Sequence, residues 1–244
     1  YRVDSALDVD SYWQIGGKPL YYVVMTEMER GRLARIGSRS NGEEDTNAAM
    51  NGTFISIDGT GASLCYRAAV RNRGHGTRSG PPNNFHVAFP RDGLWKGRSA
   101  INFNCRYTHV QILGSAIFRM AGLAAADAVA AELRINGADL AQTGSSMYGV
   151  YVRLDAFDDD FAERHFRDDP NGNLYTCYRL DSGAAEAELR YEGPDPNAYR
   201  DRYFKANHVA QDDWSDLIHM VEVLNNAPEA TYLQEVEEVI NLRQ

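Results

Sequence analysis

Cysteines and long apolar runs are both scarce in this sequence. Its three cysteines are too few and too scattered for a disulfide scaffold or a zinc knuckle, so we expect buried structural thiols: Cys65, Cys105 and Cys177. The most apolar stretch, residues 116–131, is interrupted by Arg119 and Asp127. Because a bilayer-spanning helix needs about 18 to 20 continuous apolar residues, we expect no membrane span.

Acidic residues outnumber basic residues by 34 to 25, which bears on the kind of binding partner that the sequence predicts. The formal net charge is −9 and both signs are spread along the 244 residues, so an electrostatic footprint for nucleic acid or an anionic membrane is not predicted. A cationic, metal-bridged or neutral partner fits better. The chain starts at Tyr1 without a charged-then-apolar leader, which indicates a mature secreted form or an excised piece.

Several well-known catalytic and metal motifs are also missing. The six histidines show no HExxH spacing and no Gly-x-Ser-x-Gly elbow occurs, so neither a zinc site nor a serine nucleophile is predicted. Residues 158–160 are three aspartates that could hold a hard cation or form a helix N-terminus capped by Asp158. Residues 169–173 resemble a calcium loop only loosely and favour a turn.

What is present is an alternation of apolar and polar residues in short segments. Strands are predicted at residues 20–25, 52–57, 63–71, 85–89, 130–135, 148–154 and 174–178, with turns predicted at Asp58-Gly59-Thr60-Gly61 and at Asn136-Gly137. Helices are predicted at residues 26–36, 108–121 and 158–166, and two more begin at Asp212 or Asp213 and at Pro228. Thr26 and Glu29 predict a capping box at the start of the first helix. Strands dominate the first two thirds and helices the last quarter, so we expect an α+β fold with a mainly antiparallel sheet and flanking helices.

One turn carries phosphate-compatible chemistry. Three guanidiniums and a hydroxyl surround two glycines after a strand: Arg71, Arg73, Gly74, His75, Gly76, Thr77 and Arg78. Planar guanidinium binds phosphate oxygens in a bidentate manner, and such a turn could also present backbone N–H groups. The turn is not a P-loop, because the Lys-Ser/Thr ending is missing. The alternative is a solvated basic turn.

The segment from Tyr148 to Asp155 alternates, so Val152 and Leu154 face one way while Arg153 and Asp155 face the other. We expect one face in the core and one available. Arg153 and Asp155 would then form a surface ion pair, or Asp155 would take a role in a cleft.

The order of the motifs is similar to that of the CotH kinase family, the spore-coat protein CotH-like atypical secreted kinases. The segments that carry the resemblance are Asn51-Gly52-Thr53-Phe54, Val70-Arg71-Asn72-Arg73-Gly74, Phe85-His86-Val87-Ala88-Phe89, Ile135-Asn136-Gly137 and Tyr148-Gly149-Val150-Tyr151. The match covers about residues 20 to 244.

The resemblance implies an atypical protein-kinase-like amino-terminal lobe at residues 1–180, then an incomplete helical start of a second lobe at 181–244. It further implies binding of ATP and of Mg or Mn for phosphoryl transfer in the complete protein, at the cell surface or outside it. In that case Arg71 to Arg78 bind phosphate and Asp155 is the catalytic acidic residue. The protein substrate or structural partner is not specified.

The sequence departs from the family pattern at positions that bear on catalysis. Asn83 and Asn84 stand where the family commonly has paired lysines, and Asp155 stands where it has a glutamate. Leu113-Gly114 replaces an Arg-Asn pair, and the carboxy-terminal metal-binding aspartates are not reached by Gln244. Phosphoryl transfer depends on positioning and on cations, so the alternative is a non-catalytic, pseudokinase-like structural or adhesion module.

Overall fold

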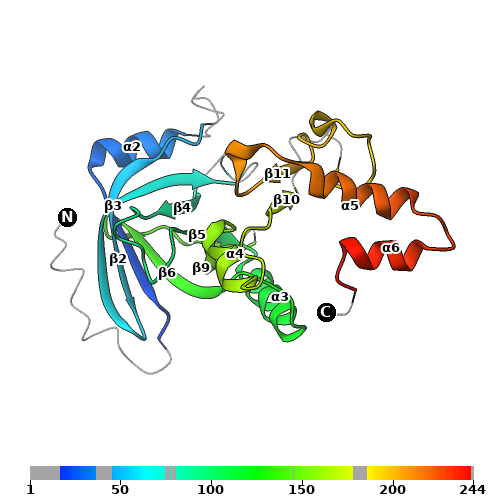
Figure 1. Ribbon diagram of the computed structural model, residues 1–244. Helices are drawn as coiled ribbons and strands as arrows, with labels where there is room; N and C mark the ends of the chain where they lie inside the picture. Colours follow the sequence, from blue (N-terminus) through cyan, green and yellow to red (C-terminus); the bar gives the residue numbers. More distant parts are fainter. Residues whose placement is uncertain are drawn as a thin grey trace. The chain divides into compact units, whose positions relative to one another are not determined.

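The computed structural model describes residues 17–36, 46–74, 78, 81–144, 146–177 and 186–242. The chain forms two compact units (Figure 1). The first unit contains residues 1–120 and 124–156, and the second contains residues 121–123 and 157–244. The boundary expected near residue 180 stays a prediction.

The first unit is a closed β-barrel of seven strands, with the strand order β6-β1-β2-β3-β4-β5-β9 and closure between β9 and β6 (Figure 1). Two short strands, β7 and β8, extend it. The strands are β1 (Leu20–Val24), β2 (Met50–Asp58), β3 (Gly61–Arg73), β4 (Asn84–Ala88), β5 (Ala100–Arg106), β6 (Val129–Ile135), β7 (Ala138–Asp139), β8 (Thr143–Gly144) and β9 (Met147–Asp155).

This architecture corrects the fold class expected from the sequence. The α+β kinase-like lobe followed by a helical segment is wrong, because the sheet closes on itself and is mixed. Strand β1 pairs in parallel with β6, whereas its pairing with β2 is antiparallel. Strand β5, which was not among the strands predicted from the sequence, joins β4 to β9 and makes closure possible.

Local signals set the β2–β3 hairpin and the β1–β6 junction. In the hairpin, Thr60 N donates to Asp58 Oδ1 at 3.0 Å, and Gly61 takes a φ of +110° that favours glycine. At the junction, Asn136 adopts the left-handed backbone conformation. Its side-chain Oδ1 accepts a hydrogen bond from Met25 N at 2.9 Å, and its Nδ2 donates one to Met25 O at 3.0 Å. The predicted turns at Asp58–Gly61 and Asn136-Gly137 are confirmed.

The barrel interior is an aromatic core. Phe54 is fully buried, and its ring lies within about 6 Å of several others, centroid to centroid. Its neighbours are Tyr21, Phe89 and Trp95, with Phe103 slightly farther at 6.4 Å. Such offset and edge-to-face packing adds to the free energy gained from apolar burial. Cys65 and Cys105 are buried, as expected, whereas Cys177 is exposed, so the expectation of a buried thiol is wrong at that position.

In its described residues the first unit has two helices, α2 (Glu27–Arg35) and α3 (Thr108–Met120). The predicted capping box of α2 is confirmed, since the Thr26 side chain accepts from Glu29 N while Glu29 bonds the Thr26 backbone. Within the described ranges, none of the helices has the length and apolar content needed to cross a bilayer, as expected.

The second unit combines helices with a small sheet. Its elements are α4 (Asp159–His165), α5 (Ser215–Asn226), α6 (Tyr232–Val239), and the antiparallel pair β10 (Tyr175–Cys177) and β11 (Tyr203–Lys205), with two short 3-10 turns. Asp158 caps α4 by accepting from Phe161 N at 3.1 Å, which confirms the capping interpretation. The core of this unit consists of Tyr199, Tyr203, Trp214, Leu217 and Val221.

Candidate functional site

The outer surface of strands β3, β4 and β5 carries a continuous polar face. Val70 and Phe85 point into the barrel core, so the alternate positions Arg71, Arg73 and His86 point outward. In the sheet register Arg71 pairs with His86, which pairs with Asn102 of β5. We call this the outer polar face, and it consists of Arg71, Arg73, His86, Asn102 and Asn104.

Neutral amides hold the side chains of this face in place. Arg73 Nη1 donates to Asn104 Oδ1, and the Asn104 amide donates to Gln111 of α3 at 2.7 Å. His86 Nδ1 lies 2.9 Å from Asn102 Oδ1. The guanidinium of Arg73 is therefore oriented, although its partner does not neutralise its charge.

Three guanidiniums lie within electrostatic reach of one another. Burial, with the charges of Arg71 and Arg78, lowers the pKa of Arg73 to about 10. Burial and Arg78 also lower the pKa of Arg71. Neither Arg71 nor Arg73 pairs with a carboxylate in the described part of the chain. Such a face attracts an anion, because a bound phosphate would supply the missing negative charge.

The same environment makes His86 a pH-sensitive group. Burial, followed by the charge of Arg71, lowers the pKa of His86 to about 4, against about 6.5 for an exposed histidine. The unfolded chain therefore binds the proton more readily, and stability present above pH 6.5 is lost as pH falls toward 4. We expect a loss of up to about 1.4 kcal/mol in the free energy of unfolding per pH unit in that window.

Urea unfolding of the wild type and of His86→Gln across pH 4 to 7 measures this effect. Subtracting the free energy of unfolding of one protein from that of the other at each pH removes the contribution of carboxylates that titrate in both proteins. If the free energies of unfolding of the wild type and of His86→Gln change with pH in the same way, the pKa of His86 is not lowered in the folded protein and the prediction is wrong.

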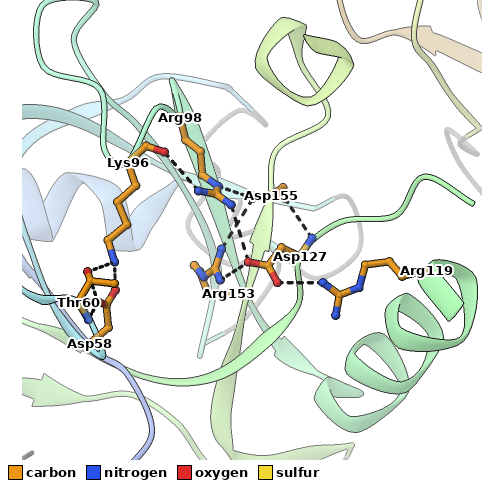
Figure 2. Close-up of polar contacts among 8 residues, drawn as sticks. All are labelled: Asp58, Thr60, Lys96, Arg98, Arg119, Asp127, Arg153 and Asp155. Carbon is orange, nitrogen blue, oxygen red and sulfur yellow. Dashed lines mark hydrogen bonds and ion pairs between the residues drawn. The ribbon is translucent and has the colours of Figure 1, made fainter. Parts of the chain in front are cut away.

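Asp155 lies on the opposite side of the barrel wall. Its register partner is Ile101, a core residue, so its carboxylate points inward and is only 2% exposed. Asp155 Oδ1 accepts from Arg98 Nε at 2.6 Å, and Oδ2 accepts from the backbone N of Asp127 at 3.1 Å (Figure 2). Both oxygens are thus occupied.

Asp155 is part of an ion network, named the interior network, that runs from the buried side chains of Arg98, Arg153 and Asp155 to the partly exposed side chains of Asp127 and Arg119 (Figure 2). Arg153, 6% exposed, donates to Asp127 Oδ2 at 2.8 Å. Burial would raise the pKa of Asp127, but the hydrogen bond and charge of Arg153 keep it below its usual value. The expected surface pair of Arg153 and Asp155 is therefore a buried one, 3.7 Å apart.

The interior network continues along the ring of Trp95. The guanidiniums of Arg98 and Arg153 lie 5.9 and 5.7 Å from the ring centroid, and the ammonium of Lys96 lies 5.2 Å from it. Lys96 also forms an ion pair with Asp58. The network thus connects the loop before β5 to two strands of the wall, β2 and β9, which indicates a structural role.

The predicted site residues are only partly brought together. Arg71, Arg73 and Arg78 lie close enough for their charges to interact, and Gly74, directly after Arg73, has a φ of +98°. The side chain of Asp155 does not face them, although its backbone O accepts from Asn102 Nδ2 at 3.3 Å. Three further predicted residues lie outside the described ranges: His75, Gly76 and Thr77.

The described residues offer no ready place for a metal ion, since no group of three or more His, Cys, Asp or Glu side chains gathers among them. Asn83 and Asn84, which stand where the resemblance predicts lysines, form hydrogen bonds within the barrel. Asn84 Oδ1 accepts from Cys105 N at 2.9 Å, and the Asn83 carbonyl accepts from Tyr151 Oη at 3.2 Å.

Sequence reasoning missed His86, Asn102 and Asn104. A partial signal existed, because arginine recurs at positions 71 and 73 and asparagine at positions 102 and 104, a spacing of two that is typical of one face of a strand. Without β5, however, nothing indicated that these short runs are neighbours.

Comparison with known families decides the identity. A family model described as CotH kinase protein matches residues 70–244, a span that contains the outer polar face and Asp155. The chain belongs to the CotH kinase family. The family resemblance noted in the sequence is thereby confirmed. No curated protein is similar enough to this CotH-family chain to count as a match.

Proposed function

We propose that this CotH-family domain binds ATP by its phosphates on the outer polar face and serves phosphoryl transfer in the complete, secreted or surface-located protein. The observation that supports the proposal is the pair Arg71 and Arg73, two partly buried cations without a carboxylate partner among the described residues. Family membership supports the choice of ATP among phosphate-bearing ligands.

In this proposal each side chain has a defined task. Arg71 and Arg73 hold phosphate oxygens, and the Asn104 amide fixes the direction of the Arg73 guanidinium. Neutralisation of phosphate charge is the main contribution that a protein makes to phosphoryl transfer. Mg or Mn would add to this neutralisation when bound, but the described residues do not form a site that fits it.

A second candidate function is a non-catalytic, pseudokinase-like structural or adhesion module. The occupied carboxylate of Asp155 favours it, because an acid held by Arg98 and the Asp127 backbone is not free to act on a substrate. In this reading the outer polar face binds an anion without transferring a phosphoryl group.

Replacing Arg73 with methionine should weaken ATP binding by at least about tenfold, since charge-assisted bonds are among the stronger polar contacts. The same change should leave the melting temperature equal or higher, because burial disfavours the charged form of Arg73. Calorimetry with ATP and with adenosine, with and without Mg or Mn, measures binding. Thermal unfolding measures stability.

Arg67→Met is the matched control, because Arg67 is exposed and already pairs with Asp92 at 2.9 Å. It should leave ATP affinity unchanged, and adenosine, which lacks phosphates, should not distinguish the variants. Equal ATP affinity in the wild type and Arg73→Met, or no binding by either, would remove the phosphate proposal. Incubation with γ-labelled ATP then separates the two candidates, because binding without label transfer supports the non-catalytic one.

A further inference from the structure

The hydrogen bonds of Asn102 fix the position of the proton on its neighbour His86. Asn102 Nδ2 donates to the backbone O of Asp155 at 3.3 Å, so the amide oxygen Oδ1 faces His86. If the amide were reversed, its oxygen would meet the Asp155 carbonyl oxygen, and no bond would form. Oδ1 can only accept, and it lies 2.9 Å from His86 Nδ1. The neutral imidazole therefore carries its proton on Nδ1 and a lone pair on Nε2.

Nε2 is the ring nitrogen that remains for a ligand. It has no hydrogen-bond partner among the described residues. His86 is half-buried, and Nε2 is not one of the buried polar atoms that lack a partner in the described part of the chain, so it is open to solvent. Since Phe85 and Val87 belong to the core, the imidazole lies on the outer side of the sheet, together with Arg71 and Arg73.

The charged groups that act on this imidazole are cations. Burial has the largest effect in lowering the pKa of His86, and the charges of Arg71 and Arg73 lower it further. Arg71 pairs with His86 across the β3–β4 ladder, and Arg78 adds a third charge that acts on both arginines. From β5 the imidazole meets Asn102, a neutral amide. Nε2 is thus kept unprotonated by burial and by the two guanidiniums that bind phosphate in the proposed function.

A bound anion reverses this electrostatic effect. Phosphate oxygens next to Arg71 and Arg73 offset the positive charges that disfavour a proton on His86. A proton on Nε2 also changes this nitrogen from an acceptor, which repels a phosphate oxygen, into a donor that binds one. Nδ1 keeps its hydrogen bond to Asn102 in both states, so the change needs no rotation of the ring.

We propose that His86 is a third anion-binding group of the outer polar face, and that its Nε2 takes up one proton from the solvent when a phosphate group binds Arg71 and Arg73. The inference rests on the phosphate binding proposed above. Because linkage between two ligands of one protein is reciprocal, the proton and the phosphate strengthen each other's binding. The face therefore binds phosphate more tightly in a mildly acidic medium than in a neutral one.

An NMR pH titration of the histidine ring signals, from pH 4 to 7.5 with and without saturating ATP, measures this proton uptake in the wild type. An opposite charge nearby shifts a pKa by about one to three units, so ATP should raise the pKa of His86 from about 4 to about 6. Adenosine, which lacks phosphates, should leave it unchanged. ATP that binds without raising the pKa of His86 would overturn this inference and leave the phosphate site intact. No ATP binding at any pH would instead remove the proposed function and this inference with it.

Calorimetry with ATP at pH 5.0 and 7.5 measures the consequence for affinity. His86→Gln is the comparison, because the titration of ATP itself affects the wild type and this variant equally. The ratio of the two dissociation constants, variant over wild type, should be about tenfold larger at pH 5.0 than at pH 7.5, as a pKa shift of about two units requires. If the ratio is the same at both pH values, His86 does not take up a proton with the phosphate. The NMR titration uses only the wild type, so it decides the question even if His86→Gln folds poorly.

Discussion

Replacement of Asp155 with alanine should lower the free energy of unfolding by about 3 to 5 kcal/mol, the usual result of removing one partner from a buried ion pair. Arg98 and Arg153 lose the carboxylate that they share, and the backbone N of Asp127 loses its acceptor. Chemical denaturation followed by tryptophan fluorescence, with Trp95 inside the network, measures the change.

Two further variants define the cause of this loss. Asp92→Ala removes a carboxylate from the exposed pair with Arg67 and should change stability far less. Asp155→Asn keeps an oxygen for the Asp127 N–H but removes the charge, so its cost should fall between the other two. If Asp155→Ala unfolds no more easily than Asp92→Ala, the network does not stabilise the barrel.

Phe54→Ala should cost about 3 to 5 kcal/mol, the range for truncating a buried phenylalanine. Phe54 is 0% exposed and contacts the rings of Tyr21, Phe89 and Trp95, so the change leaves a cavity at the centre of the core. Urea unfolding at neutral pH measures the loss.

Phe118→Ala, on α3, provides the comparison, because this ring is 55% exposed. Its substitution should stay within about 0.5 kcal/mol of the wild type. A small effect at Phe54, similar to that at Phe118, would contradict the position of the aromatic core.

Local features of the fold were predictable from the sequence, and closure of the sheet was not. The capping box at Thr26, the hairpin at Asp58–Gly61 and the cap at Asp158 each rest on a few adjacent residues. The barrel depends on β5 and on the parallel pairing of β1 with β6, which lie far apart in the chain. No local pattern specifies such a pairing, since each strand alternates in the same way whatever its partner.

The candidate site likewise has features that the sequence predicts locally and features that depend on the fold. The three guanidiniums of Arg71, Arg73 and Arg78 were found because they are adjacent in sequence and chemically alike. The position of Asp155 could not be found, because alternation indicates two faces of a strand without telling which one is inside. Here the face with Arg153 and Asp155 is the interior, and two buried charges are acceptable there only because Arg98 and Asp127 complete the network.

The parallel pairing of β1 with β6 also sets an order of events during synthesis. Leu20 pairs with Glu132, so one hydrogen-bonding edge of β1 stays unpaired until β6, about 110 residues later in the chain, has been synthesised. At about 5 to 20 residues per second, the wait is on the order of 5 to 20 s. During that time the nascent chain presents an unpaired strand rich in tyrosine and valine, which is the kind of segment that chaperones protect from aggregation.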